Sequence, residues 1–568
     1  MMKRKFFNAI LAGALLTAGC NKDYLDITPT DRFVSEIAWS DANLVELYVN
    51  GMYQAIPHGF ETHMWSKYTD EAYGDDTWLL GTWNPDNISN YGQASNWIDY
   101  YTRAYQFIRR ANIFLAEVGN SPVTEARKKQ LTAEVKFVRA FIYANLIWRY
   151  GSVPVVEDTY DLTDKVTFTK KPYDEVVTYL TADLDAAIPD LPTKYNPGDA
   201  AFGRATKHAA MALKSRVYLY AASPLQNPTN DQAKWQKAAD AAKVIIDLNA
   251  YQLPADYGTS FLSTNAEQIF VRTFNNTTGH LVTFTNTNNT YGGWGGFGGR
   301  NAPSQNLVDD YEMINGELPY LANGAINPAS NYNPNNPYAN RDPRFYQTVI
   351  YQGDIFRPEA RGAFPAAYDV SESVSGFDAS GNPILIGPSA RGADNYKRNG
   401  DNSRTGYSLK KFIDRTLPIS RSNGGYSQPW IFFRLGEIYL NYAEAMSELG
   451  QDNVAREYVN KIRKRAGLPD LPTTITGTAL RDRIRHERRI ELAFEGHRFF
   501  DVRRWKIAPQ VESIDIKGVD IYKKPDNSLV YIPKVLIDRP TWNDRFYYIP
   551  IPRSEINKGA VTQSPLWD

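Results

Sequence analysis

A series of long amphipathic segments, separated by short breaks, constrains this chain to a mostly helical fold. Apolar residues recur at spacings of three and four, which is the period of a helix with one buried face. Gly, Pro and Asn clusters separate most of these segments. Stacked pairs of such helices predict an all-α repeat superhelix. We expect helices at residues 41–55, with Asp41 as the cap, and at 96–118, 124–150, 173–188, 207–222 and 231–248.

A further helical hairpin is expected late in the chain, at residues 438–467. Ala443, Gly450 and Ala455 repeat the spacing of small residues found in a tetratricopeptide unit, where two helix backbones approach closely. Any tight helical hairpin needs small residues, so this pattern alone leaves the type of repeat open. A charged helix is expected next, around residues 481–494, with its Arg and Glu side chains paired three and four positions apart.

The composition changes between about residues 254 and 434, where Asn, Gly, Pro and aromatic residues replace the helical pattern. Long irregular stretches inside a folded chain are usually functional or ordered by packing on a scaffold. Aromatic rings in polar loops suit carbohydrate, because sugar faces stack on rings while hydroxyls bond to amides and carboxylates. We therefore expect a large loop-rich ligand-binding face carried by the helices.

The start of the chain has the form of an export signal. A basic stretch at residues 3–5 precedes an apolar run at 6–18, which is too short to span a bilayer. The only cysteine, Cys20, follows a Leu-Leu-Thr-Ala-Gly sequence directly. This spacing predicts a signal peptide over residues 1–19 and lipidation of the Cys20 thiol. The alternative is an ordinary secretory signal with a chance cysteine beside its cleavage site.

Charge and motif patterns argue against several other functions. The 63 Lys and Arg residues balance the 63 Asp and Glu residues, so nucleic acid is a poor partner. His486-Glu487 begins like a zinc-protease motif, but Ile490 stands where the second His is required. A G-x-G-x-x-G match at residues 293–298 lacks the preceding strand that a dinucleotide site needs. No metal or cofactor is expected, whereas a carboxylate pair for glycoside hydrolysis stays open because it depends on the fold.

Several short motifs, spread over nearly the whole chain, occur together in one known family. They include Val138-Arg139-Ala140-Phe141-Ile142-Tyr143, Arg149-Tyr150-Gly151-Ser152-Val153-Pro154, Arg341-Asp342-Pro343-Arg344-Phe345, and the longer segments 433–445 and 487–505. With Cys20 and the closing Tyr548-Ile549-Pro550-Ile551-Pro552, the chain resembles the SusD/RagB family of nutrient-binding outer-membrane lipoproteins of Bacteroidetes. Several motifs in the expected order are more specific than any one of them.

The resemblance implies a single domain built on four tetratricopeptide-like helix pairs with a variable, loop-rich face. It divides the chain into a signal peptide at 1–19, an N-terminal helical region at 20–250, and a C-terminal region at 251–568. The last region holds the variable loops and the final helical repeat, and it forms one compact unit with the region before it. The resemblance also implies a lipid-anchored, surface-exposed outer-membrane protein that acts as a lid on a SusC-type, TonB-dependent transporter.

Ligand contacts in this family come from variable loops, so the shared motifs identify no contact residue. We therefore take candidates from three loop clusters, which are expected to form a two-sided clamp and a closing segment. For each aromatic ring the alternative is packing on the helices beneath, and for the closing segment it is a solvated surface. The candidates are Asp70, Asp75, Asp76, Trp78, Trp83 and Asn84 in the early cluster; Asn288, Asn289, Tyr291, Trp294 and Phe297 in the glycine-rich loop; and Arg344, Arg391 and Tyr396 in the closing segment.

The leading hypothesis is a non-catalytic surface lipoprotein that binds oligosaccharide or polysaccharide and delivers it to a TonB-dependent transporter. A peptide-binding, RagB-like uptake protein is the nearest alternative, and a deep groove lined by backbone donors would favour it. A surface glycoside hydrolase and a scaffold that binds only other proteins are the remaining alternatives.

Overall fold

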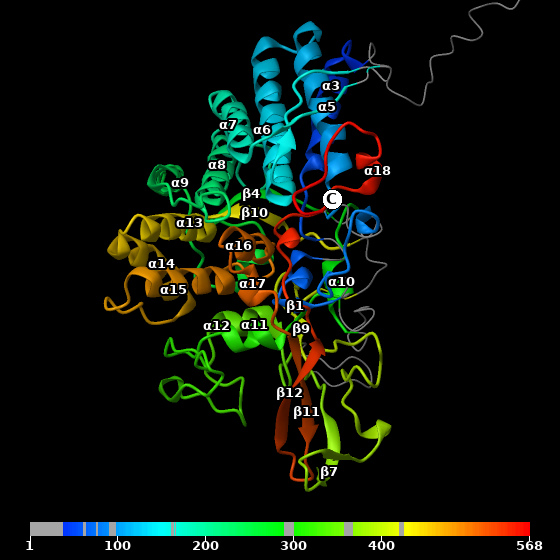
Figure 1. The fold of residues 1–568 in the computed structure, drawn as a ribbon, viewed down its shortest axis with the longest axis vertical. Helices are drawn as coiled ribbons and strands as arrows, with labels where there is room; N and C mark the ends of the chain where they lie inside the picture. Colours follow the sequence, from blue (N-terminus) through cyan, green and yellow to red (C-terminus); the bar gives the residue numbers. More distant parts are fainter. Residues whose placement is uncertain are drawn as a thin grey trace, which may run out of the picture.

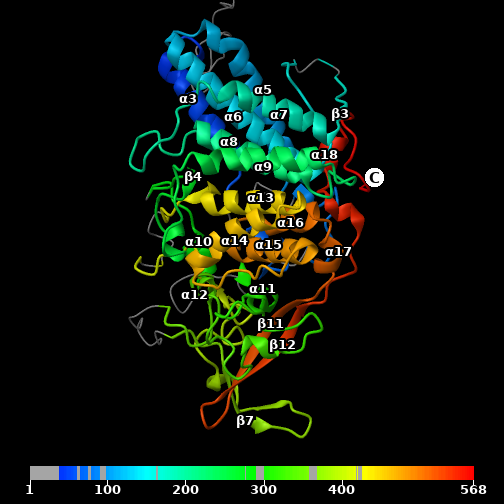
Figure 2. The ribbon, with the colours of Figure 1, turned by 90° about the vertical axis from the view of Figure 1, so that its left-hand side faces the viewer.

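The structure is a computed structural model that describes residues 38–60, 64–74, 78–89, 98–160, 164, 166–275, 277–288, 300–356, 367–417, 419 and 425–567. Long helices gather toward one end of the molecule, and loops with small sheets form the opposite end (Figures 1 and 2). None of the helices in the described ranges is long and apolar enough to cross a membrane.

The six helices expected in the N-terminal half are present. Asp41 caps the first of them as predicted, because its Oδ1 accepts a hydrogen bond from the backbone N–H of Asn43 at 2.7 Å. The boundaries agree closely except that α5 begins at Tyr101 rather than at 96. The helices are α3 (Ala42–Met52), α5 (Tyr101–Glu117), α6 (Glu125–Tyr150), α7 (Tyr173–Ala187), α8 (Lys207–Ala222) and α9 (Gln232–Asp247).

These helices form a continuous stack that the chain leaves and later rejoins. Neighbours along the chain pack on one another from α5 to α9, and α9 then packs on α13 (Leu435–Glu448). The long loop-rich segment is therefore inserted between two helices in direct contact. Next to α13 lie α14 (Asp452–Ala466) and α15 (Gly477–Glu491), which extend the stack (Figure 2). The all-α repeat superhelix expected from the sequence is confirmed.

A tight turn joins α13 to α14, as the small-residue spacing predicted. Gly450 has a φ of +73°, a left-handed conformation that favours glycine, and its N–H donates to the carbonyl of Ser447 at 3.0 Å. Ala443 and Ala455 are completely buried, one on each helix. Small side chains therefore lie where the two helices meet.

Short helices and strands make up the rest of the described fold, partly beside the long helices and partly at the loop-rich end (Figures 1 and 2). The short helices are α10 (Val282–Asn286), α11 (Gln305–Asp310), α12 (Pro343–Thr348), α16 (Arg498–Arg504), α17 (Ala508–Val511) and α18 (Arg553–Ile556). The strands in two-stranded pairs are β1 (Ala72–Tyr73) with β5 (Ala302–Pro303), β2 (Val153–Pro154) with β3 (Lys170–Lys171), β4 (Gln268–Arg272) with β10 (Trp430–Arg434), and β6 (Val349–Ile350) with β9 (Ser408–Leu409).

A four-stranded sheet projects from this end (Figure 1) and was not predicted. Its order is β12 (Leu529–Ile537), β11 (Ile516–Lys523), β7 (Glu372–Phe377) and β8 (Pro383–Leu385). Strands β11 and β12 form an antiparallel hairpin, while β7 pairs with β11 in parallel. Most of β12 is neither fully buried nor fully exposed, so its sequence lacks the alternation that marks a strand with one buried face.

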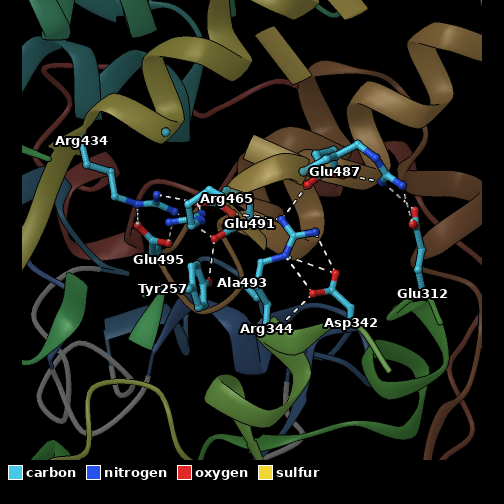
Figure 3. Close-up of polar contacts among 12 residues, drawn as sticks. Tyr257, Glu312, Asp342, Arg344, Arg434, Arg465, Glu487, Glu491, Ala493 and Glu495 are labelled. Atoms are coloured by element: carbon cyan, nitrogen blue, oxygen red, sulfur yellow. Dashed lines mark hydrogen bonds and ion pairs between the residues drawn. The ribbon is translucent and has the colours of Figure 1, made fainter. Parts of the chain in front are cut away.

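A network of buried ion pairs joins the helical stack to the loop-rich end (Figure 3). Among the described residues it connects equal numbers of cations and carboxylates, so its formal charges cancel. This balance matters because an unpaired buried charge costs several kcal/mol. The cations are Arg344, Lys411, Arg434, Arg463, Arg465 and Arg483, and the carboxylates are Glu267, Glu312, Asp342, Glu487, Glu491 and Glu495.

Glu491, near the end of α15, is the centre of this network. Its Oε1 accepts hydrogen bonds from Arg434 at 2.7 Å and Arg465 at 2.5 Å, and its Oε2 accepts one from Arg344 at 3.0 Å. Burial alone would raise the pKa of Glu491, but the three arginines outweigh it and hold the pKa well below its usual range. Glu491 is therefore ionised and bonded to three separate elements.

The other pairs extend from this centre to segments of the loop-rich end. Arg344 on α12 binds Asp342 at 2.8 Å and Glu487 at 2.6 Å. Arg463 on α14 binds Glu487 at 3.0 Å and Glu312 at 2.9 Å, the latter just after α11. These contacts fix the positions of α11 and α12 against the last helices of the stack.

The pairing pattern corrects one prediction from the sequence. We expected the charges around residues 481–494 to pair with one another along the helix, but the described ion pairs of α15 reach other elements. The reason is that one side of this helix packs against its neighbours, so Glu487, Arg488 and Glu491 are buried and meet partners across the packing interfaces. The charged side chains of α15 therefore stabilise the fold, as expected, but through ion pairs to other elements and not along the helix.

Candidate ligand-binding face

Two of the three predicted loop clusters border strands that pair with each other. Strand β1 precedes the early loop at residues 75–77, and β5 follows the glycine-rich loop at 289–299. The two strands pair antiparallel, with Tyr73 opposite Ala302, and the contact continues as the N–H of Ser304 donates to the carbonyl of Glu71 at 2.9 Å. The loops themselves lie outside the described residues, together with the candidates Asp75, Asp76, Asn289, Tyr291, Trp294 and Phe297.

Buried amide side chains hold the base of the glycine-rich loop. Asn301 donates through Nδ2 to Oδ1 of Asn286 at 2.8 Å, so residues on either side of the loop are tied together. Its own Oδ1 accepts a hydrogen bond from the N–H of Met64 at 2.9 Å. Because these amides are buried and bonded to one another, they give the loop a fixed starting point.

The third loop cluster joins the same base through Asn288. The Nδ2 of Asn288 donates to Oδ1 of Asp394 at 3.2 Å, and its Oδ1 accepts a hydrogen bond from the hydroxyl of Ser408 at 3.3 Å. Asp394 also accepts a bond from the N–H of Asp369 at 2.9 Å. Arg404 extends the connection to β1, since its Nη1 donates to the Tyr73 hydroxyl at 3.1 Å. The early loop, the glycine-rich loop and the part of the third cluster around Asp394 therefore start from one shared base, in which Asn288 is buried.

Arg391 and Tyr396 remain at the surface of this third segment. Arg391 pairs with Glu372 at 3.1 Å, and Lys397 pairs with the other oxygen of Glu372 at 2.9 Å. The Lys534 ammonium lies 4.5 Å from the centre of the Tyr396 ring, and both Arg391 and Tyr396 are partly exposed. These two candidates keep polar or aromatic surface available for a ligand.

Two aromatic candidates lie in the core instead of on the face. Trp83 is 0% exposed and Trp78 is 4% exposed. Their ring centroids are 4.5 Å apart, and Trp78 also contacts Phe546 while Trp83 contacts Tyr68, each at 5.0 Å. Burial of such large rings among other rings is strongly favourable. The expectation that they are stacking platforms for a ligand is therefore corrected, and the packing alternative applies.

Three polar candidates are also occupied by structural contacts. Asp70 pairs with Arg489 at 2.7 Å and Arg498 at 2.9 Å, and these arginines outweigh its burial and keep its pKa well below the usual range. Asn84 caps a turn through hydrogen bonds that its Oδ1 accepts from the N–H groups of residues 86 and 87. Arg344, with a side chain 1% exposed, belongs to the ion network. Asp70 and Arg344 are therefore not placed to contact a ligand, whereas Asn84 is partly exposed.

Glu71 carries a carboxyl group whose pKa would suit an acid catalyst in a hydrolytic enzyme. Burial raises its pKa to about 7, a value that an acid catalyst for glycoside cleavage would need. Glu71 is only 1% exposed, however, so its carboxyl group cannot reach a glycosidic bond on the surface. Within the described residues, no group of three or more His, Cys, Asp or Glu side chains is arranged to hold a metal ion.

Apart from Asn288, which was expected to contact the ligand, the residues that build the shared base were not predicted. Asn286, Asn301, Asp394 and Ser408 sit in segments whose polar composition indicates loops, and no local pattern shows which polar residues are buried. The closest signal is the occurrence of Asn on both sides of the glycine-rich run. The contact between Asn286 and Asn301 depends on how the chain returns, which a single sequence does not show.

Comparison with known proteins places these features in one family. The model of the SusD family matches residues 266–567, and a model described as starch-binding, associating with the outer membrane, matches residues 23–219. A solved SusD-like protein from Bacteroides fragilis is 30% identical, with 95% of this chain and 100% of that chain covered, at a TM-score of 0.74.

Two further relatives are described by their ligands. A SusD-like carbohydrate-binding protein of known structure from Bacteroides fragilis is 26% identical, with 92% of this chain and 98% of that chain covered, at a TM-score of 0.70. The starch-binding protein SusD of Bacteroides thetaiotaomicron is 25% identical over 449 residues, which are 75% of this chain and 71% of that protein.

The raised pKa of Glu71 predicts a specific dependence of stability on pH. The folded state holds this proton more tightly than the unfolded state, whose pKa is near 4.5, so the stabilisation is complete below about pH 4.5 and is lost as the pH rises toward 7. We expect Glu71→Gln to gain about 1–3 kcal/mol in unfolding free energy relative to the unmodified protein between pH 4.5 and 8. Denaturant titrations of both proteins across this range measure the difference, and a difference that does not change with pH would contradict the assignment.

Proposed function

The chain belongs to the SusD family, and from this premise we propose that it is a non-catalytic surface lipoprotein that binds oligosaccharide or polysaccharide and delivers it to a TonB-dependent outer-membrane transporter. The observation that carries the proposal is the shared buried base from which three polar, aromatic-rich loop segments start. Two relatives named for carbohydrate or starch binding support the class of ligand.

The base supports binding because it reduces the freedom that a ligand would otherwise have to remove. Asn286, Asn288 and Asn301 anchor the glycine-rich loop by its two ends, and β1 anchors the early loop beside it. Loops positioned by a rigid scaffold lose less conformational entropy on binding. Tyr291, Trp294 and Phe297 would supply the stacking surfaces and Asp75, Asp76 and Asn289 the polar contacts, as the sequence suggests.

Binding without cleavage is supported by the state of three carboxylates within the described residues. Glycoside hydrolysis needs two carboxyl groups on either side of the scissile bond. Asp70 is held by two arginines, Glu71 is buried, and Glu372 pairs with Arg391 and Lys397. Incubation with a glycan that the protein binds, followed by chromatography, should recover the glycan unchanged, and shorter products would overturn this part.

The lipid anchor in this proposal is inferred from the start of the chain, and the transporter partner is inferred from the family. Cys20 lies outside the described residues, and it follows a typical lipoprotein signal. We expect a palmitate analogue to label the protein in cells and to be absent from Cys20→Ala, because the thiol is the acceptor. Label retained on the variant would contradict lipidation at this residue.

Replacement of the two tryptophans should separate ligand contact from core packing. We expect Trp294→Ala to weaken binding of the best polysaccharide by about 1–3 kcal/mol, since a stacking ring is lost, with little change in melting temperature. Trp83→Ala should instead destabilise the fold by about 3–5 kcal/mol, because it leaves a cavity in the core.

Isothermal titration against a panel of polysaccharides and peptides, with thermal unfolding of each variant, provides both measurements. Affinity for peptides alone would favour the RagB-like alternative over the proposed function. Unchanged affinity in Trp294→Ala would remove the glycine-rich loop from the binding site.

A further inference from the structure

A second groove lies between the N-terminal helices and strand β4. It consists of two cavities of about 300 and 280 Å³, which share residues 202–204, Phe270 and Val271 in their walls. The cavities follow β4 from Gln268 to Thr273, just beyond its end, and reach Asn50 on α3. The described residues that line them are different from those of the shared base, so this groove is a separate feature of the molecule.

A glycine lies in the wall that the two cavities have in common. Gly203 has a φ of +96°, and a Cβ atom at this position would lie 3.3 Å from the carbonyl oxygen of Val271. A side chain here would therefore press against β4 in the wall between the cavities, which the glycine leaves without a side chain.

Aromatic rings and amides line the groove in the combination that suits sugars. Tyr195, Phe202 and Tyr251 are partly exposed in its walls, and Asn50, Asn196 and Asn265 lie among them. The two tyrosines are held by their hydroxyls, Tyr251 to His208 Nδ1 at 2.9 Å and Tyr195 to Gln130 Nε2 at 3.2 Å. Rings fixed in this way offer faces for stacking at little entropic cost.

The charges along the groove have one sign. Its described lining includes Lys194 in the first cavity, Arg272 in the second and Arg204 in both, with no Asp or Glu among these lining residues. Arg204 pairs with the buried Glu134 at 2.7 Å, and the guanidinium of Arg272 lies 5.2 Å from the centre of the Phe274 ring. Lys194 and Arg272 place positively charged side chains at the two ends of the groove.

The neighbouring histidines respond to this positive potential. Burial is the main cause that lowers the pKa of His208 and of His58, the latter to about 3, but Lys194 adds to the effect at His208 and Arg272 at His58. A ligand that complements such a groove carries its own negative charge, and its carboxylates can occupy positions that protein carboxylates take in sites for neutral sugars.

We propose that this groove is a second binding site, selective for acidic oligosaccharides that contain uronic acid units. Sugar rings would stack on Tyr195, Phe202 and Tyr251 while the carboxylates meet Lys194 and Arg272. The inference shares with the proposed function only the class of ligand, since the two sites use different residues. The site would extend the range of glycans held by the protein beyond those that the loop face selects.

Titration with tetragalacturonate and with its fully methyl-esterified, uncharged form tests the site, because the two probes differ mainly in charge. We expect the acid to bind at least tenfold more tightly than the ester at low ionic strength, and the difference to shrink as salt is added. Lys194→Ala/Arg272→Ala should lose at least tenfold in affinity for the acid. Lys129→Ala/Lys558→Ala, which removes two exposed lysines on other elements, should leave the affinity unchanged.

Two further variants distinguish loss of binding at the groove from a folding defect and from binding at the loop-rich face. Lys194→Glu changes one exposed side chain and should also weaken binding of the acid, whereas Trp294→Ala should not. Equal affinity for acid and ester, no binding of the acid at millimolar concentration, or full binding in Lys194→Ala/Arg272→Ala would overturn the proposal. Tighter binding of hexaglutamate at the same residues would assign the groove to acidic peptides and also overturn it. Binding of neutral glycans that depends on Trp294 is measured separately, so the loss of one proposed site can be distinguished from the loss of the other.

Discussion

The rest of this structure depends on the ion network that Glu491 centres. Burying charged groups is costly unless each meets a partner in good geometry, and then removal of one partner is more costly still. Arg344, Arg434 and Arg465 come from three different segments, yet all bind one carboxylate. Because the three segments bind the same carboxylate, the network fixes how the final helices of the stack pack against the segments of the loop-rich end.

Buried ion pairs also connect the scaffold to the candidate ligand-binding face. Asp70, which precedes β1, is held by Arg489 on α15 and Arg498 on α16. Strand β1 in turn pairs with β5, next to the amide contact of Asn286 with Asn301. A rigid, charge-bonded scaffold therefore extends to the bases of the loops, so that loop sequences can differ without disturbing the fold.

The scaffold could be predicted from the sequence much better than the site. Helices α5 and α9 bury residues at the predicted spacing of three and four. Thr206 caps α8 through a hydrogen bond that it accepts from the N–H of Ala209 at 3.1 Å. The partners of the charged residues in α15 could not be predicted, because Arg and Glu at helical spacing look the same on a solvated surface and at a buried interface. Trp83 was placed on the surface for a related reason, since its polar neighbours in sequence are not its neighbours in space. The shared base shows the same limit, because Asn286 and Asn301 meet only through the path of the chain.

Hydrogen exchange of Glu491→Gln, compared with the unmodified protein and with Asp482→Asn on the exposed side of α15, tests this account most directly. We predict that loss of the central charge lowers the free energy of unfolding by about 3–5 kcal/mol. Amide exchange should then accelerate in α12 and α14 and also in β1, β5 and β9, which are distant in sequence, while Asp482→Asn changes neither quantity appreciably. Faster exchange confined to α14 and α15, or a loss of less than about 0.5 kcal/mol, would contradict the claim that this network holds the scaffold to the binding face.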